Sequence, residues 1–139
     1  MDIVCIAKPG VNLADTLYTS ETSRNILRFY HPKDMKWGVK IPVSTVSNAL
    51  ALLSELRWYT MRYTSEVIIE DVEYGVFMTR LLASAAYEDR SVALSPDWRF
   101  SYRAAVLEDG SLMRCPRGVD TPAGTLVSFL VWCIEKEEP

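Results

Sequence analysis

The feature that most constrains the fold is a strict alternation of apolar and more polar residues over residues 98–106. The apolar positions are Trp98, Phe100, Tyr102, Ala104 and Val106. A period of two places alternate side chains on one face of a β-strand. Asp109-Gly110 follows and supplies the positive φ that a tight hairpin turn requires, and residues 112–115 lead back. The stretch therefore predicts an antiparallel hairpin with one buried face.

A different spacing marks a helix. Apolar residues recur three and four positions apart between residues 46 and 56, which predicts a helix over residues 44–63. Residues 2–8 and 67–69 are apolar and β-branched and predict strands. Residues 24–31 and 36–42 predict a hairpin around the Pro32-Lys33-Asp34 turn. Its second strand would carry Trp37, Val39 and Ile41 on one face.

Four segments are less distinct. Residues 11–23 predict a loop or a short helix, and residues 91–94 predict a short strand. Residues 72–87 favour a helix, although Gly75 weakens that prediction. Residues 122–135 also favour a helix, because Thr121-Pro122 is typical of a helix start. The β-branched and aromatic residues of that last segment favour a strand instead, so both interpretations stay open.

The order of these elements predicts an α+β fold. Strands come as hairpins and not in regular β-α-β alternation, which favours a mostly antiparallel sheet with two to three helices packed on one face. The chain has 139 residues, of which 49% are hydrophobic, and no Gly-, Ser- or Pro-rich linker divides it. We therefore expect residues 1–139 to form a single domain.

The three cysteines, Cys5, Cys115 and Cys133, are odd in number and widely spaced. This pattern predicts free thiols rather than disulfides or a zinc site. No apolar run approaches the roughly 18–20 residues that cross a bilayer, and Asp2 stands where a signal peptide carries a base. We expect a chain without a transmembrane segment in the reducing cytoplasm.

Familiar catalytic chemistry is poorly supported. His31 is the only histidine, and the six glycines are too scattered for a phosphate-binding loop. A cluster of acids at Glu66, Glu70, Asp71 and Glu73 could bind a cation, but acids also stabilise the start of a helix, and we favour that interpretation. The sequence thus predicts no catalytic residue, no metal site and no cofactor.

The most informative surface pattern combines aromatic and basic residues. On a helical wheel Trp58 falls with Arg62, away from the leucine stripe. Tryptophan and arginine anchor protein interfaces and also bind nucleic acids. Another part of the chain could equally cover Trp58. The candidate interface or ligand-binding residues are Arg28, Lys33, Lys36, Trp37, Trp58 and Arg62.

These observations favour a non-catalytic protein that binds another macromolecule. Small acidic chains of this kind are often inhibitors, immunity-type proteins or virus-encoded accessory or structural proteins. The first alternative is a protein that binds nucleic acid or an anionic membrane surface through residues 24–63, where the net charge is +5. The overall pI of about 5.2 argues against it. The second alternative is a small enzyme with an unfamiliar site.

The charge is unevenly divided along the chain. Residues 1–63 carry eight Lys/Arg against five Asp/Glu, a net charge of +3. Residues 64–139 carry seven against thirteen, a net charge of −6. This asymmetry predicts that the basic, aromatic half of one molecule contacts the acidic half of another, so that the protein forms a homo-oligomer.

Overall fold

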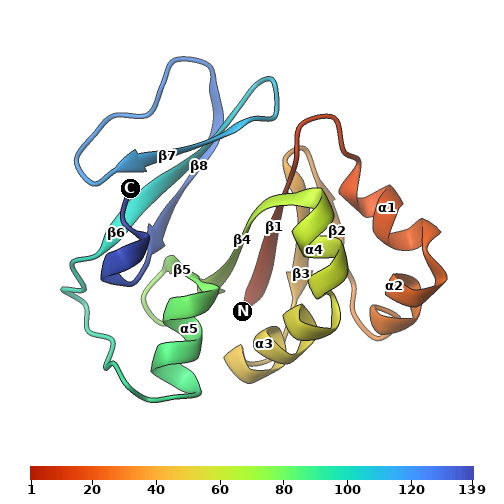
Figure 1. Ribbon diagram of the computed structural model, residues 1–139, viewed down its shortest axis with the longest axis horizontal. Coiled ribbons are helices and arrows are strands. Elements are labelled where there is room, and N and C mark those ends of the chain that lie inside the picture. The colour runs from red at the N-terminus through yellow and green to blue at the C-terminus, as the bar shows by residue number, and fades with distance from the viewer.

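The first strand of the chain, β1 (Asp2–Ala7), lies inside a sheet of eight strands (Figure 1). The computed structural model describes all 139 residues. The strand order is β2-β3-β1-β4-β5-β8-β6-β7, and only the β5–β8 pair is parallel. The other strands are β2 (Lys33–Met35), β3 (Gly38–Pro42), β4 (Thr64–Asp71), β5 (Val76–Thr79), β6 (Ser101–Leu107), β7 (Leu112–Pro116) and β8 (Thr125–Trp132).

Five α-helices lie between these strands along the chain, and one short 3-10 helix follows β8. They are α1 (Leu13–Thr19), α2 (Glu21–Ile26), α3 (Val46–Glu55), α4 (Arg57–Tyr63), α5 (Arg80–Tyr87) and η1 (Glu135–Glu137). Three of the helices begin at a side-chain cap. Asn12, Thr45 and Thr79 each accept a hydrogen bond from the backbone N–H three residues later, at 3.1–3.2 Å. Such caps satisfy amides that have no partner within the helix.

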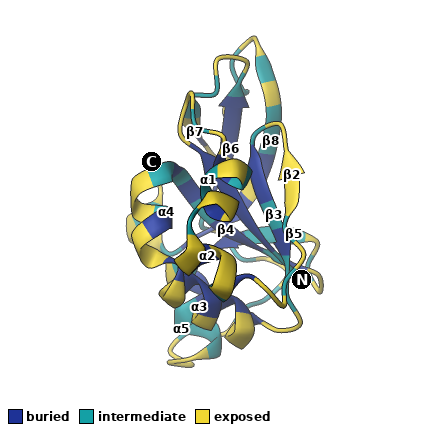
Figure 2. Ribbon diagram, turned by 90° about the vertical axis from the view of Figure 1, so that its right-hand side faces the viewer, coloured by how far each residue is buried: buried dark blue, intermediate teal, exposed yellow.

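The central strands carry a core on each face. The larger core, of 20 buried residues, joins the helices to the face of β1, β3 and β4 that bears Ile3, Ile41 and Ile69. The smaller core, of nine, joins the opposite face, with Val4 and Ile68, to β6 and β8, and contains no helical residue. The sheet therefore bends so that its last strands cover the face that the helices leave open. Figure 2 shows the buried strands behind the exposed surfaces of α1, α2 and β2.

The α+β class is confirmed, in one compact domain. The predicted hairpin is present as β6 and β7, and Gly110 in its turn has a φ of 86°. Its first strand begins only at Ser101, so Trp98 and Phe100 lie in the loop before it and pack against different cores. The helix predicted over residues 44–63 is present as α3 and α4, which meet at Leu56. The number of helices was underestimated, because α1 and α2 are short and α5 follows β5 directly.

The strand predicted over residues 24–31 is wrong. Residues 21–26 form α2 and the chain then turns, so the hairpin partner of β3 is the shorter β2. Ile26, Leu27 and Tyr30 pack against the larger core. Tyr30 follows Leu27 by three residues and Ile26 by four, a spacing that suits a helical turn better than a strand.

Two helix predictions need correction. Residues 72–87 contain a turn at Gly75 (φ 67°), then β5, and only then α5. Residues 125–132 form β8, so the strand interpretation of that segment is correct. Phe129 and Val131 point into the smaller core at a period of two, which fixes the segment as a strand. Residues 91–94 form no strand.

Candidate functional site

The exposed tryptophan predicted from the helical pattern lies on α4. The chain turns at Leu56, which is buried, and α4 then exposes most of its residues while burying Tyr59. Trp58 is 54% exposed and Met61 67% exposed. No other part of the chain covers Trp58, and the question left open by the sequence is thereby answered.

Trp58 borders a hollow of about 450 Å³ between α1 and α4, which we call the α1–α4 hollow. Its lining residues are Asp15, Thr16, Thr19, Ser20, Trp58, Tyr59 and Tyr63. The Tyr59 hydroxyl and the Ser20 hydroxyl lie 2.6 Å apart and share a hydrogen bond. This bond ties α4 to the junction of α1 and α2, and it lowers the pKa of Tyr59. The hollow is therefore formed by side chains that already hold one another in place.

The ring of Trp58 is fixed by three neighbours. Its edge-to-face contacts with Tyr59 and Tyr63 have centroid separations of 4.9 and 6.1 Å. The Arg62 guanidinium lies 4.2 Å from the centroid of the Trp58 ring, within the range of a cation–π contact. An aromatic ring that is held in this way loses little conformational entropy when a partner binds.

The six predicted site residues fall in four places. Trp58 and Arg62 lie together on α4. Arg28 lies beyond α2, with its guanidinium 4.5 Å from the centroid of the exposed Phe29 ring. Lys33 lies on the exposed edge strand β2, and Lys36 in the β2–β3 turn.

Trp37 lies apart from this exposed set. The expectation that Trp37, Val39 and Ile41 share one face is wrong, because β3 begins only at Gly38. Val39 and Ile41 enter the larger core, whereas Trp37 packs beside the smaller one. Its ring meets that of Phe129 edge to face, with centroids 5.4 Å apart.

A second hollow, of about 480 Å³, lies near the C-terminal strands, and we call it the C-terminal hollow. It contains the aromatic side chains of Tyr74, Trp98 and Trp132, together with Arg103 and Arg117. No pattern in the sequence indicated this hollow. Arg103 is the one arginine of the hollow that lies on β6, while Arg117 and these three aromatic residues come from other segments.

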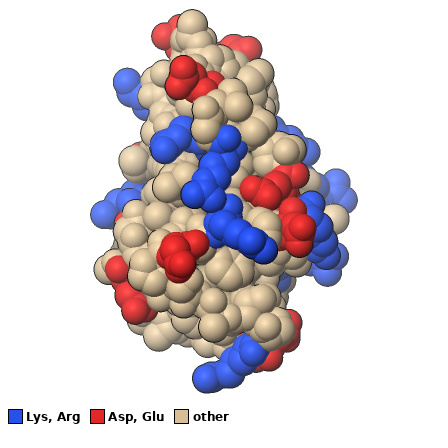
Figure 3. All heavy atoms as spheres, turned by 90° about the vertical axis from the view of Figure 1, so that its left-hand side faces the viewer, with Lys and Arg blue, Asp and Glu red and all other residues tan.

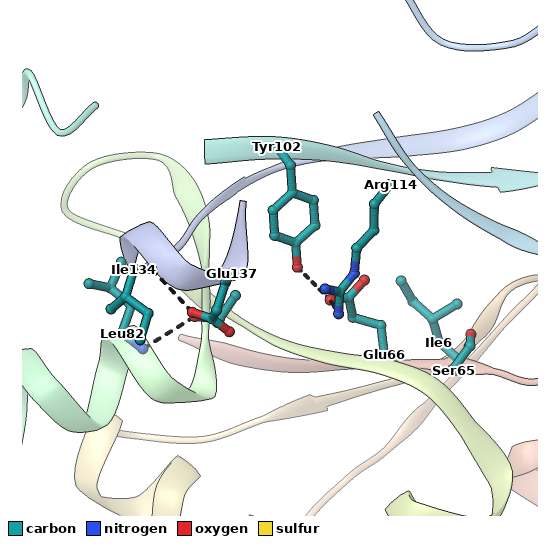
Figure 4. A network of polar contacts seen from close by, with 9 residues as sticks. Ile6, Ser65, Glu66, Leu82, Tyr102, Arg114, Ile134 and Glu137 are labelled. Atoms are coloured by element: carbon teal, nitrogen blue, oxygen red, sulfur yellow. Dashed lines mark hydrogen bonds and ion pairs between the residues drawn. The ribbon is translucent and has the colours of Figure 1, made fainter. Parts of the chain in front are cut away.

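A buried polar cluster connects the two halves of the bent sheet. Figure 4 shows Tyr102 and Arg114 reaching from β6 and β7 toward Glu66 on β4. Glu66 Oε1 accepts hydrogen bonds from the Tyr102 hydroxyl and, at 2.7 Å, from Arg114 Nη2. Glu66 Oε2 is buried without a partner. Contrary to expectation, Glu66 thus lies on a strand and not near the start of a helix.

The electrostatics of this cluster favour a fixed ion pair. Burial and the Glu66 carboxylate raise the pKa of Tyr102, so its hydroxyl keeps its proton. Burial alone would lower the pKa of Arg114, but Glu66 raises it above its ordinary value. Glu66 lines none of the surface hollows. The cluster therefore connects β4 to β6 and β7 through a buried carboxylate.

The remaining reactive groups are dispersed. Cys5, Cys115 and Cys133 are all free and buried, as predicted, whereas His31 is exposed. No three His, Cys, Asp or Glu side chains lie close enough together to hold a metal ion. None of the helices combines the length and the apolar character needed to span a lipid bilayer.

Residues 1–106 match the model of a family described as "Family of unknown function (DUF5804)". This segment contains the whole α1–α4 hollow and all six predicted site residues. The C-terminal hollow takes Arg117 and Trp132 from outside the matched segment. No curated protein and no solved structure matches the chain.

Proposed function

This chain belongs to the DUF5804 family of unknown function, and we propose that it is a non-catalytic interaction protein that associates with a second copy of itself through α4. The observation that carries the proposal is the exposure of Trp58 beside the α1–α4 hollow. Tryptophans that anchor interfaces commonly sit in a firm setting of this kind, where neighbouring groups exclude water once the partner binds.

The composition of α4 supports a protein interface. Its exposed residues are Arg57, Trp58, Met61 and Arg62, and the helix contains no acidic residue. Trp, Tyr, Met and Arg are enriched at interfaces, while Lys, Glu and Asp are depleted there. Trp58, Met61 and Arg62 also share one helical face because they are three and four positions apart.

The distribution of charge supports a second copy as the partner. The α4 surface carries two arginines, whereas residues 64–139 have a net charge of −6. Several acids of that half are exposed, among them Glu108, Asp109, Glu135 and Glu138. Opposite charges on two regions of the same surface favour contact between neighbouring molecules.

Sedimentation velocity at low and high salt tests this proposal. We expect concentration-dependent association at low salt and weaker association at high salt, because the Debye length shortens. Trp58→Ala and Arg62→Glu should each abolish the association. A strict monomer at low salt and high protein concentration would exclude self-association.

Phe29→Ala is the matched control. Phe29 is even more exposed than Trp58, at 78%, and its ring also has an arginine guanidinium beside it, that of Arg28. Phe29 borders none of the hollows, so its removal should leave association unchanged. If Phe29→Ala and Trp58→Ala weakened association equally, the contact would be a general effect of exposed aromatic rings and the assignment to α4 would be wrong.

A further inference from the structure

The C-terminal hollow is built on the face of the last strands that is turned away from the smaller core, at the edge of the larger core. Tyr102 on β6 and Val131 on β8 point into the smaller core. Their neighbours Ser101, Arg103 and Trp132 point the other way and line the hollow. The turn after β7, which includes Arg117, and the loop before β6, which includes Trp98, complete its walls.

Three aromatic rings belong to the apolar lining of this hollow, beside Val76, Val119 and Leu130. The rings of Tyr74 and Trp132 have their centroids 5.2 Å apart. The indole N–H of Trp98 donates a hydrogen bond of 2.9 Å to the carbonyl of Cys133, which fixes that ring at the edge of β8. Trp132 is only 7% exposed and belongs to the larger core, so it supports the other two rings from behind. The half-buried rings of Tyr74 and Trp98 offer the faces on which a planar ligand group can stack.

The charged part of the hollow is purely cationic. Arg103 and Arg117 line it, and no Asp or Glu is among the lining residues. Neither arginine forms an ion pair, since those of the chain involve only Lys40 and Arg114. Arg117 Nη1 donates a hydrogen bond of 2.6 Å to the carbonyl of Arg99, which holds its guanidinium in place. Figure 3 shows Lys and Arg side chains gathered in a band across this side of the molecule.

Two polar groups at the hollow lack partners in the protein. Ser101 is only 5% exposed, and its hydroxyl makes no hydrogen bond. Trp132 is 7% exposed, and its indole N–H likewise donates to no protein atom. Neither atom is among the fully enclosed polar atoms that lack a partner, so both donors reach the space of the hollow and are free to bind a ligand there.

We propose that the C-terminal hollow binds a nucleoside phosphate. The base of this ligand would lie against the aromatic rings, and its phosphate would bind Arg103 and Arg117. The volume of about 480 Å³ falls within the range of small-molecule sites. Arginine binds phosphate through paired N–H donors. A free nucleotide and the end of a single-stranded nucleic acid present the same chemistry to this hollow.

Titration calorimetry with AMP tests the proposal on the full chain, and tryptophan fluorescence gives a second signal because Trp98 and Trp132 line the hollow. Adenosine, inorganic phosphate and a short oligoadenylate serve as comparison ligands. We expect AMP to bind more tightly than adenosine or phosphate. Arg103→Gln and Arg117→Gln should each weaken AMP binding about tenfold, as the loss of one charge-assisted contact implies.

Arg28→Gln is the control, because Arg28 is exposed and lies elsewhere. It should bind AMP as the unaltered chain does. Ser101→Ala should weaken binding severalfold while the hollow keeps its shape. Tighter binding of oligoadenylate than of AMP would identify a nucleic-acid end as the source of the ligand.

Three results would overturn the proposal. The first is the absence of saturable AMP binding through the millimolar range. The second is unchanged binding in both Arg103→Gln and Arg117→Gln, since the phosphate would then lie elsewhere. The third is equal affinity for AMP and for either adenosine or phosphate. A site that binds a nucleoside phosphate must gain affinity from both the base and the phosphate.

Discussion

Glu66 and Arg114 form an ion pair of 2.7 Å that joins β4 to β7, although three strands lie between them in the sheet. The Glu66 side chain is buried, whereas Arg114 is partly exposed. Glu66 and Arg114 can meet because the sheet bends and brings its last strand back over β4. Tyr102 reinforces the same connection from β6, so Glu66 receives two donors from the C-terminal strands.

Tyr102→Phe tests how much this connection stabilises the fold. The variant keeps the ring and deprives Glu66 of one hydrogen bond, so we expect the free energy of unfolding to fall by about 1–3 kcal/mol. Urea unfolding measures this change. Glu66→Gln and the double variant complete a cycle, whose coupling energy should lie at about 0.5–3 kcal/mol for groups in direct contact.

Tyr18→Phe is the matched control for that experiment. Tyr18 is exposed, and its hydroxyl makes no hydrogen bond, so the change should cost less than about 0.5 kcal/mol. Equal costs for Tyr18→Phe and Tyr102→Phe would show that the bond to Glu66 contributes nothing.

Gly38→Ala should prevent β1 and β3 from pairing. A Cβ at Gly38 would lie 1.9 Å from the carbonyl oxygen of Cys5, a backbone atom that cannot move without separating the strands. We expect a loss above about 4 kcal/mol, at the extreme end for single substitutions. Circular dichroism and urea unfolding would detect it.

Gly10→Ala separates this steric effect from backbone strain. Gly10 has a φ of 79°, but no atom lies within 4 Å of a Cβ built there. A left-handed conformation costs a non-glycine residue about 1–2 kcal/mol. A comparable loss in Gly10→Ala and Gly38→Ala would mean that the contact with Cys5 is relieved easily.

The buried thiols predict a decline of stability in alkali. Burial raises the pKa of Cys5 from 9.0 to about 12, and that of Cys133 to about 12. Between these values the unfolded chain has released the thiol proton while the native chain retains it. Because the unfolded state then binds fewer protons, stability must fall as the pH rises from 9 toward 12.

Each thiol should contribute a slope of up to about 1.4 kcal/mol per pH unit. Urea unfolding at several pH values measures this slope. Tyrosines also titrate in alkali, so the slope of Cys5→Ala is subtracted from that of the unaltered chain to give the contribution of the Cys5 thiol alone. A parallel decline in both proteins would show that the Cys5 thiol keeps its ordinary pKa when the chain folds.

The sequence predicted the parts of the fold that depend on local pattern. The hairpin of residues 101–116 could be predicted because the alternation and the turn residues both indicate it. The strand of residues 125–132 could not, since Leu126, Phe129, Leu130 and Cys133 fit a helical stripe as well as a strand. The segment is a strand because it pairs with β5 and β6. Nothing in its own residues indicates that pairing.

The candidate sites follow the same division. Trp58 and Arg62 are four positions apart on one helix, so the helical pattern alone was enough to bring them together. The C-terminal hollow combines Tyr74, Trp98, Arg117 and Trp132 from segments far apart in the chain. The bend of the sheet and the turn after β7 bring these residues together. The periodicity of the sequence indicates neither the bend nor the position of the turn.

The contrast between two tryptophans tests the assignment of α4 as an interface. Trp37 packs edge to face on Phe129, whereas Trp58 is largely exposed. Trp37→Ala should cost about 2–3 kcal/mol, below the usual cost for a fully buried tryptophan. Trp58→Ala should change the free energy of unfolding by less than about 0.5 kcal/mol when the protein is dilute and monomeric. If urea unfolding gave both variants the same large loss, Trp58 would serve the fold, and its exposure would no longer support an interface.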